Sequence, residues 1–87
     1  GTTGVYMISA QVEFAMNTSG TRGIIIYAGS NPTFEIDQPT SIDNITRIAA
    51  CNIFKLNASD SVTIHVYQTS GTNVNINSAY FNIARIA

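Results

Sequence analysis

Few side chains in this chain have the chemistry of a catalytic group. His65 is the only histidine and Cys51 the only cysteine. A catalytic triad needs three converging groups, and no nucleophile can be argued beside His65, which lies between two apolar residues. No basic neighbour in the sequence would stabilise a thiolate at Cys51, so we expect a buried, unreactive thiol. Glu13 and Glu35 would suit a glycosidase only in a sheltered cleft at a fixed separation. We therefore expect no catalytic residue; a glycan depolymerase is the least favoured alternative.

Oxygen-bearing side chains gather in one stretch, where Glu35, Asp37, Asp43 and Asn44 follow one another. Carboxylate and amide oxygens are the ligands that Ca²⁺ prefers. Their spacing matches no calcium-binding loop, and no glycine provides its sharp turn. We expect a solvated acidic loop and no metal or other cofactor, with a calcium site in residues 35–44 as the alternative.

Exposed aromatic and amide side chains in loops suit saccharide recognition, because a sugar ring stacks on an aromatic ring and its hydroxyls bind amides. The residues of this kind are Tyr27, Asn31, Thr72 and Asn73. The alternative is that these are ordinary polar loops, which carry no binding role.

The composition excludes several classes of function. Charged residues make up 10% of the 87 residues and the net charge is −1, so no basic field is available for nucleic acid. No apolar run reaches 18 residues, so we expect no membrane insertion. A single cysteine cannot form an internal disulfide. Polarity comes instead from Asn, Thr and Ser, which suits a rigid β-structure.

Residues 4–14 (GVYMISAQVEF) are the element that would position the rest. One face, from Tyr6 to Phe14, is wholly apolar, which predicts a β-strand packed on a core. The other face begins with Val5, Met7 and Ser9 and becomes polar only later, so a second surface must cover part of it. Alternation and turn residues predict further strands at 22–28, 33–36, 42–56, 61–68, 73–77 and 79–86, with no helix. The chain is expected to be one all-β domain, residues 1–87.

Three segments resemble C1q- and tumour-necrosis-factor-like jelly rolls. Residues 4–14 resemble strand C of that family, which reads Gly-x-Tyr followed by alternating apolar residues. Residues 54–62 (FKLNASDSV) resemble its E-to-F turn, with Ser59 where the family commonly has Gly. Residues 80–83 (YFNI) resemble the last strand, H. The resemblance implies an antiparallel jelly-roll sandwich lacking the N-terminal strands that should precede Gly4, which would expose a sheet edge and part of the core.

The family assembles as trimers, so the resemblance implies a homotrimer whose inner sheet holds strands C, F and H. Matching by position, with Ala49 assigned to strand E, gives the implied interface: Met7, Ser9, Gln11, Ala49, Tyr80, Ala84 and Ile86. The residues of opposite phase should fill the sandwich, namely Tyr6, Ile8, Ala10, Val12, Phe14, Phe54, Val62, Ile64, Val66, Phe81 and Ile83.

Low charge, a single cysteine and richness in Asn and Thr are most similar to the C1q-like domains of bacteriophage fibres and bacterial surface proteins. The expected function is a trimeric structural and binding head at a virion surface, which locks three chains and presents loops to a host glycan or protein receptor. The alternative is a secreted, extracellular signalling or recognition ligand of the same fold.

Overall fold

The computed structural model describes residues 3–40 and 45–87, and the described residues form strands, turns and loops without a helix. The strands are β1 (Gly4–Phe14), β2 (Thr21–Ala28), β3 (Phe34–Pro39), β4 (Thr46–Leu56), β5 (Val62–Gln68) and β6 (Ile76–Arg85). The predicted all-β class is confirmed. The strand expected at 73–77 instead forms the approach to β6, and the small residues at 49–51 do not interrupt β4. Residues 42–44, expected to begin β4, lie outside the described part.

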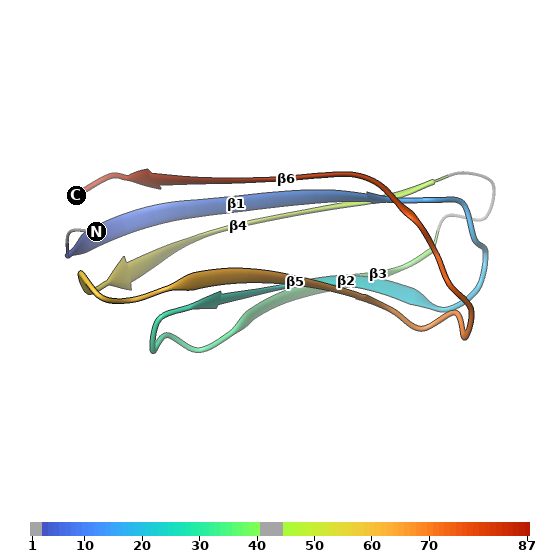
Figure 1. The fold of residues 1–87 in the computed structure, drawn as a ribbon, viewed down its shortest axis with the longest axis horizontal. Coiled ribbons are helices and arrows are strands. Elements are labelled where there is room, and N and C mark those ends of the chain that lie inside the picture. Colours follow the sequence, from blue (N-terminus) through green and yellow to red (C-terminus); the bar gives the residue numbers. More distant parts are fainter. Residues whose placement is uncertain (1–2, 41–44) are drawn as a thin grey trace.

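Two antiparallel three-stranded sheets face each other in a β-sandwich (Figure 1). One sheet has the order β4-β1-β6 and the other the order β3-β2-β5. The sandwich is elongated, 43 Å along its longest axis, and both chain ends lie at the same end of it. The packing between the two layers is carried by the central strands β1 and β2 together with β4, which lies over β2 and β3.

The alternation along β1 determines its place in the fold. Ile8, Ala10, Val12 and Phe14 are all buried in the core between the sheets. From β2 they are met by Ile24, Ile26 and Ala28. Because side chains alternate across a strand, this leaves Met7, Ser9, Gln11 and Glu13 on the outward face of the β4-β1-β6 sheet.

One side of the sandwich is open, and part of the predicted core is exposed there. Val66, Phe81 and Ile83 were expected in the interior but are 37%, 42% and 43% exposed. Tyr6, Val62 and Ile64 are only partly buried against the core. The reason is that β5 and β6 are edge strands, and their inward side chains lack a facing strand.

The interior also holds a charged residue, Arg22, whose side chain is fully buried. Its guanidinium lies 5.8 Å from the ring centre of Phe14. Nη1 donates to the carbonyls of Ser19 (2.9 Å) and Thr21 (3.0 Å), and Nη2 donates to that of Asn17 (3.2 Å). Nε has no partner. Arg22 thus ties the β1–β2 connection to the core, a role that the sequence analysis did not assign to it.

The turn between β4 and β5 is held by Asp60. Asp60 Oδ2 accepts a hydrogen bond from the amide of Asn57 at 2.7 Å, and the Asp60 amide donates back to the Asn57 carbonyl at 3.0 Å. The same side chain lies beside Gly29, whose φ of +57° and closeness to the carboxylate leave no room for a Cβ. Two neighbouring turns are therefore fixed by one carboxylate.

Candidate functional site

Six of the seven residues that the resemblance implies as an interface lie on one surface, the outward face of the β4-β1-β6 sheet. The strand register sets Gln11 between Ala49 and Tyr80, in the middle of the sheet. Towards the chain termini, Ser9 lies between Cys51 and Asn82, and Met7 between Ile53 and Ala84. The seventh residue, Ile86, lies past the end of β6, where its amide donates to the Val5 carbonyl at 2.8 Å. We call this surface the β1 outer face; its three central rows are Met7/Ile53/Ala84, Ser9/Cys51/Asn82 and Gln11/Ala49/Tyr80.

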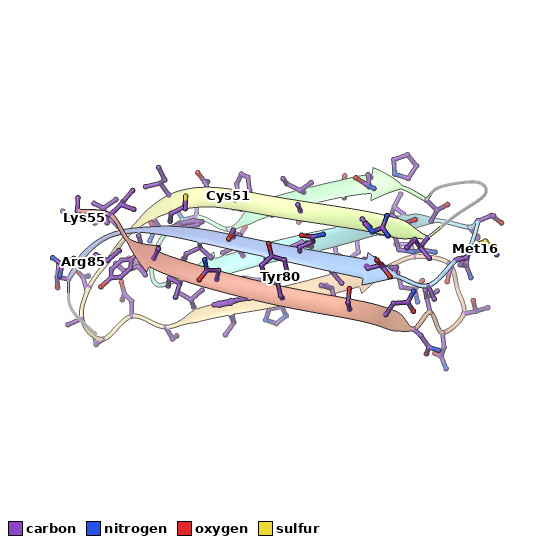
Figure 2. The ribbon with its side chains drawn as sticks, turned by 90° about the horizontal axis from the view of Figure 1, so that it is seen from above. Met16, Cys51, Lys55, Tyr80 and Arg85 are labelled. Carbon is purple, nitrogen blue, oxygen red and sulfur yellow. The ribbon has the colours of Figure 1, made fainter. Side chains whose placement is uncertain are left out.

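The three central rows of the β1 outer face contain no charged residue. Met7 is 38% exposed, Ile53 57% and Tyr80 62%, so large apolar groups lie on the surface beside small ones. Figure 2 looks onto this sheet, with Tyr80 near its middle and Cys51 on β4. A flat strip of small, apolar and uncharged polar side chains can be covered without burying a charge.

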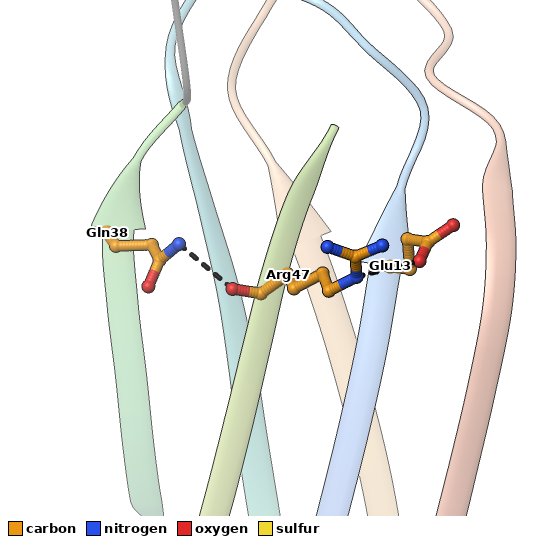
Figure 3. Close-up of polar contacts among 3 residues, drawn as sticks. All are labelled: Glu13, Gln38 and Arg47. Carbon is orange, nitrogen blue, oxygen red and sulfur yellow. Dashed lines mark hydrogen bonds and ion pairs between the residues drawn. The ribbon is translucent and has the colours of Figure 1, made fainter. Parts of the chain in front are cut away.

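Charged groups lie only at the two ends of this face. At one end Arg47 Nε is paired with Glu13 Oε1 at 2.9 Å, and Lys55 lies at the other end. Gln38 Nε2 donates to the Arg47 carbonyl at 3.1 Å, which links β3 to β4 across the closed side of the sandwich (Figure 3). The exposed ion pair contributes little stability, but it marks where the uncharged strip ends.

The structure corrects the prediction of a buried thiol at Cys51, and it adds Ile53 to the face that holds the proposed interface residues. Cys51 is exposed, not buried, because its phase on β4 places it on the β1 outer face opposite Ser9. Ile53 has the same phase and lies opposite Met7. The signal was available in the alternation of residues 46–56, whose even-numbered members are the buried ones.

The outward face of the β3-β2-β5 sheet has a different chemistry. Tyr67 lies across Gly23 of β2, where a Cβ would collide with the phenol ring. Its Oη is 2.8 Å from Glu35 Oε2 and 2.9 Å from Asp37 Oδ2, so one proton serves two carboxylates. This face therefore carries two acidic groups near its centre.

The only histidine has an aromatic partner on the same outward face. His65 packs edge-to-face on Tyr27, with ring centroids 4.8 Å apart. Like Tyr67, it belongs to β5 and its side chain points away from the core. The aromatic contact gives His65 a packing role.

The phenol of Tyr67 is expected to stay protonated in alkaline solution. Its hydrogen bond to Glu35 raises the pKa of Tyr67 well above the ordinary value, and partial desolvation and the bond to Asp37 act in the same direction. Any stability from this contact is present below the unfolded-state pKa and is lost as pH rises through the folded-state pKa. In a spectrophotometric tyrosine titration, the wild type should show a late component that Tyr67→Phe lacks. Gly23→Ala, which displaces the ring, should move that component to lower pH; an unchanged titration would contradict the contact.

The calcium hypothesis gains no site among the described residues. Within 3–40 and 45–87, no group of three or more His, Cys, Asp or Glu side chains lies close enough to hold a metal ion. Glu35 and Asp37 are engaged with Tyr67, whereas Asp43 and Asn44 lie outside the described residues. Likewise, no helix in the part of the chain that the structure covers is long and apolar enough to cross a membrane.

The four residues proposed for ligand binding do not form one site. Asn31 is near the Val62 end of the sandwich, where Nδ2 donates to the carbonyls of Ala28 (2.8 Å) and Lys55 (2.9 Å). Thr72 and Asn73 lie in the β5–β6 connection at the opposite end (Figure 1). The Thr72 carbonyl accepts from Gln68 Nε2 at 2.7 Å. Tyr27 packs edge-to-face with His65. Because these residues lie on different elements and at opposite ends of the sandwich, one shared ligand cannot reach them all.

Comparisons with known proteins do not identify the chain. No protein-family model matches it, and no curated protein and no solved structure does so. Two structural features bear on function: the two outward faces differ in charge, and the sandwich is open between β5 and β6. The β1 outer face, uncharged along its centre, is the strongest candidate for a functional surface.

Proposed function

We propose that this chain is a trimeric structural and binding head, in which the β1 outer face of each subunit is covered by its two partners. The observation that carries the proposal is the uncharged centre of that face, where exposed Met7, Ile53 and Tyr80 lie among small residues. Covering these side chains is favourable at roughly 25 cal/mol per Å² of apolar area. A domain of this size also has a small core, which association would extend.

The contrast with the other sheet supports this choice of face. Covering the β3-β2-β5 outward face would bury the carboxylates of Glu35 and Asp37, which have a phenol as their hydrogen-bond donor. Removing two such charges from water costs several kcal/mol unless the partner supplies cations. A second copy of this nearly uncharged chain would bring the same carboxylates, so the β1 outer face is the better surface for self-association.

The arrangement of strands supports a C1q/TNF-like jelly roll as the finer description of the sandwich. In that family, strands C, F and H belong to the inner sheet, and the sheet order β4-β1-β6 suits this if β1 is C, β4 is F and β6 is H. This reading moves Ala49 from strand E to strand F, and makes the Asp60 turn the F-to-G turn. The reassignment is needed because β3, which is longer than the predicted strand at 33–36, takes the place of strand E.

The proposed setting is the surface of a virion, as the head of a fibre, with a host glycan or protein as receptor. Three identical subunits would present three copies of each loop, and linked weak sites bind a surface far more strongly than one. The secreted recognition ligand would use the same assembly in an extracellular setting. Neither setting is needed for the trimer, which can be tested by itself.

Light scattering after size exclusion is the direct test. We expect a mass of three times the 9.3 kDa chain at micromolar concentration. Cys51 provides an independent readout, because it is exposed in the isolated subunit but lies on the β1 outer face. Its alkylation should be at least about tenfold slower in the native assembly than in the denatured chain. A monomer with a fast-reacting thiol would refute the proposal.

A further inference from the structure

An apolar groove runs along the open side of the sandwich, between β5 and β6. One cavity of about 280 Å³ is lined by residues that include Ile64 and Val66 of β5 and Ile76 and Phe81 of β6. A second cavity, of about 240 Å³, is lined by residues that include Val62 of β5, Ile83 of β6 and Asp60. Apart from Asp60, no charged side chain lines either cavity, so the groove is suited to uncharged, apolar groups.

The two sheets are offset, and this determines which strand lacks a partner. On the closed side β4 packs over both β2 and β3. The sheet β4-β1-β6 is therefore displaced relative to β3-β2-β5, and β6 extends past the edge of β5. The inward side chains Phe81 and Ile83 overhang the position where one more strand beside β5 would lie. Their exposures of 42% and 43% result from that missing strand.

The backbone of β5 presents free hydrogen-bonding groups to that position. The Thr69 amide donates to Thr21, and the Gly29 amide donates to Ser61, so the odd-numbered residues of β5 are those bonded to β2. The amides and carbonyls of Val62, Ile64 and Val66 then point to the free edge. Their side chains point into the groove, opposite the inward side chains of β2. Backbone and apolar side chains therefore offer the same strand-shaped site.

We propose that the groove binds an extended peptide segment, which adds antiparallel to the free edge of β5 beneath β6. In an antiparallel ladder, the residues opposite Val62, Ile64 and Val66 exchange hydrogen bonds with them and point to the same face. Each residue that bonds to β5 must therefore also place an apolar side chain in the groove. A small apolar molecule would fill the cavity but leave these backbone groups unpaired, whereas a strand satisfies both requirements.

The inference does not depend on the trimer, because the hydrogen-bonding groups that it uses belong to the free edge of β5, although Gln11 and Tyr80 of the β1 outer face also contribute to the lining of the first cavity. The segment is identified by its chemistry: roughly six to eight residues, extended, with uncharged apolar side chains at alternate positions.

The test uses synthetic peptides added to the isotope-labelled protein and followed by NMR. The probe alternates valine and threonine over roughly eight residues, with a lysine at each end for solubility. Two N-methylated versions provide matched controls. Methylation of the valine amides should weaken binding by at least about tenfold, because those amides face β5. Methylation of the threonine amides should change affinity by no more than about threefold, because those amides face solvent.

Two substitutions on β5 complete the design. Val66→Asp places a charge in the groove and should reduce affinity by at least about tenfold, whereas Thr63→Asp, on the outward face of the same strand, should not. We expect one peptide per chain and shifts confined to β5, β6 and the groove. The proposal would be overturned if no peptide bound, or if both methylated peptides lost affinity equally. It would also be overturned if the protein alone showed a mass increase that Val66→Asp abolishes, because that result would assign the groove to a second copy. A light-scattering mass of one chain with peptide binding intact would refute only the trimer.

Discussion

Tyr80→Asp should convert the assembly into monomers. Tyr80 is 62% exposed in the isolated subunit, so a carboxylate at this position is solvated and the subunit itself still folds. In the proposed trimer, three copies of that carboxylate would lie within the covered centre of the β1 outer face. Burying unpaired charges costs several kcal/mol each, which exceeds what a small interface provides. Light scattering should show the mass falling to that of one chain.

Tyr27→Asp is the matched control for that substitution. It makes the same chemical change on a strand, at a tyrosine that is 41% exposed, but on the outward face of the other sheet. We expect the Tyr27→Asp protein to keep its trimeric mass, although it loses the edge-to-face contact with His65. A Tyr80→Asp protein that remained trimeric and equally heat-stable would show that this face is not the interface.

Arg22→Ala should destabilise the fold more than any other single arginine substitution among the described residues. The substitution removes three hydrogen bonds to the carbonyls of Asn17, Ser19 and Thr21 and leaves those carbonyls without their donor. It also opens a cavity beside Phe14, since the Arg22 side chain is fully buried. Losses of this kind cost about 3–5 kcal/mol, a large part of the stability of a small domain.

Arg47→Ala is the matched control, because it removes the same side chain from a surface position. Arg47 is 60% exposed and pairs with Glu13, so its loss should cost no more than about 1 kcal/mol. Urea unfolding of both variants gives the free energies directly, and the slope of the transition reports whether each unfolds in one step. Equal effects at the two positions would contradict the buried role of Arg22. Arg22→Lys should fall between them, since a single ammonium cannot reach all three carbonyls that Nη1 and Nη2 bind.

The assignment of roles to faces follows from a difference in charge. Along β1 the outward positions Met7, Ser9 and Gln11 are uncharged, and the neighbouring strands match them. On the other sheet, Glu35 and Asp37 interrupt the outward face. The open groove adds a third surface, whose free backbone edge distinguishes it from both faces. Under the two proposals, one small sandwich offers a face that is covered in the trimer, a solvated face and a strand-binding edge.

The sequence by itself determined the strands and the phase of the central one. The alternation from Tyr6 to Phe14 decided which side chains are buried, because side chains on a strand point to opposite faces in turn. The proposed interface residues on β4 and β6 came instead from the family resemblance, and it is the strand register that puts Ala49, Tyr80 and Ala84 on the face of Met7, Ser9 and Gln11. The turn at Asp60 was likewise readable, because a short carboxylate side chain can bond nearby backbone amides.

Only the tertiary structure decided how the strands combine. The alternation of apolar residues along a strand carries no information on the offset between the sheets. The sequence therefore predicts Phe81 and Ile83 in the core, although β6 overhangs the edge of β5 and leaves them exposed. The burial of Arg22 depends on strand register and on what packs against that face of β2. The same holds for Tyr67, which reaches Glu35 and Asp37 only because Gly23 lies between them. These contacts join residues far apart in the chain, and no local periodicity encodes which strand will be the neighbour.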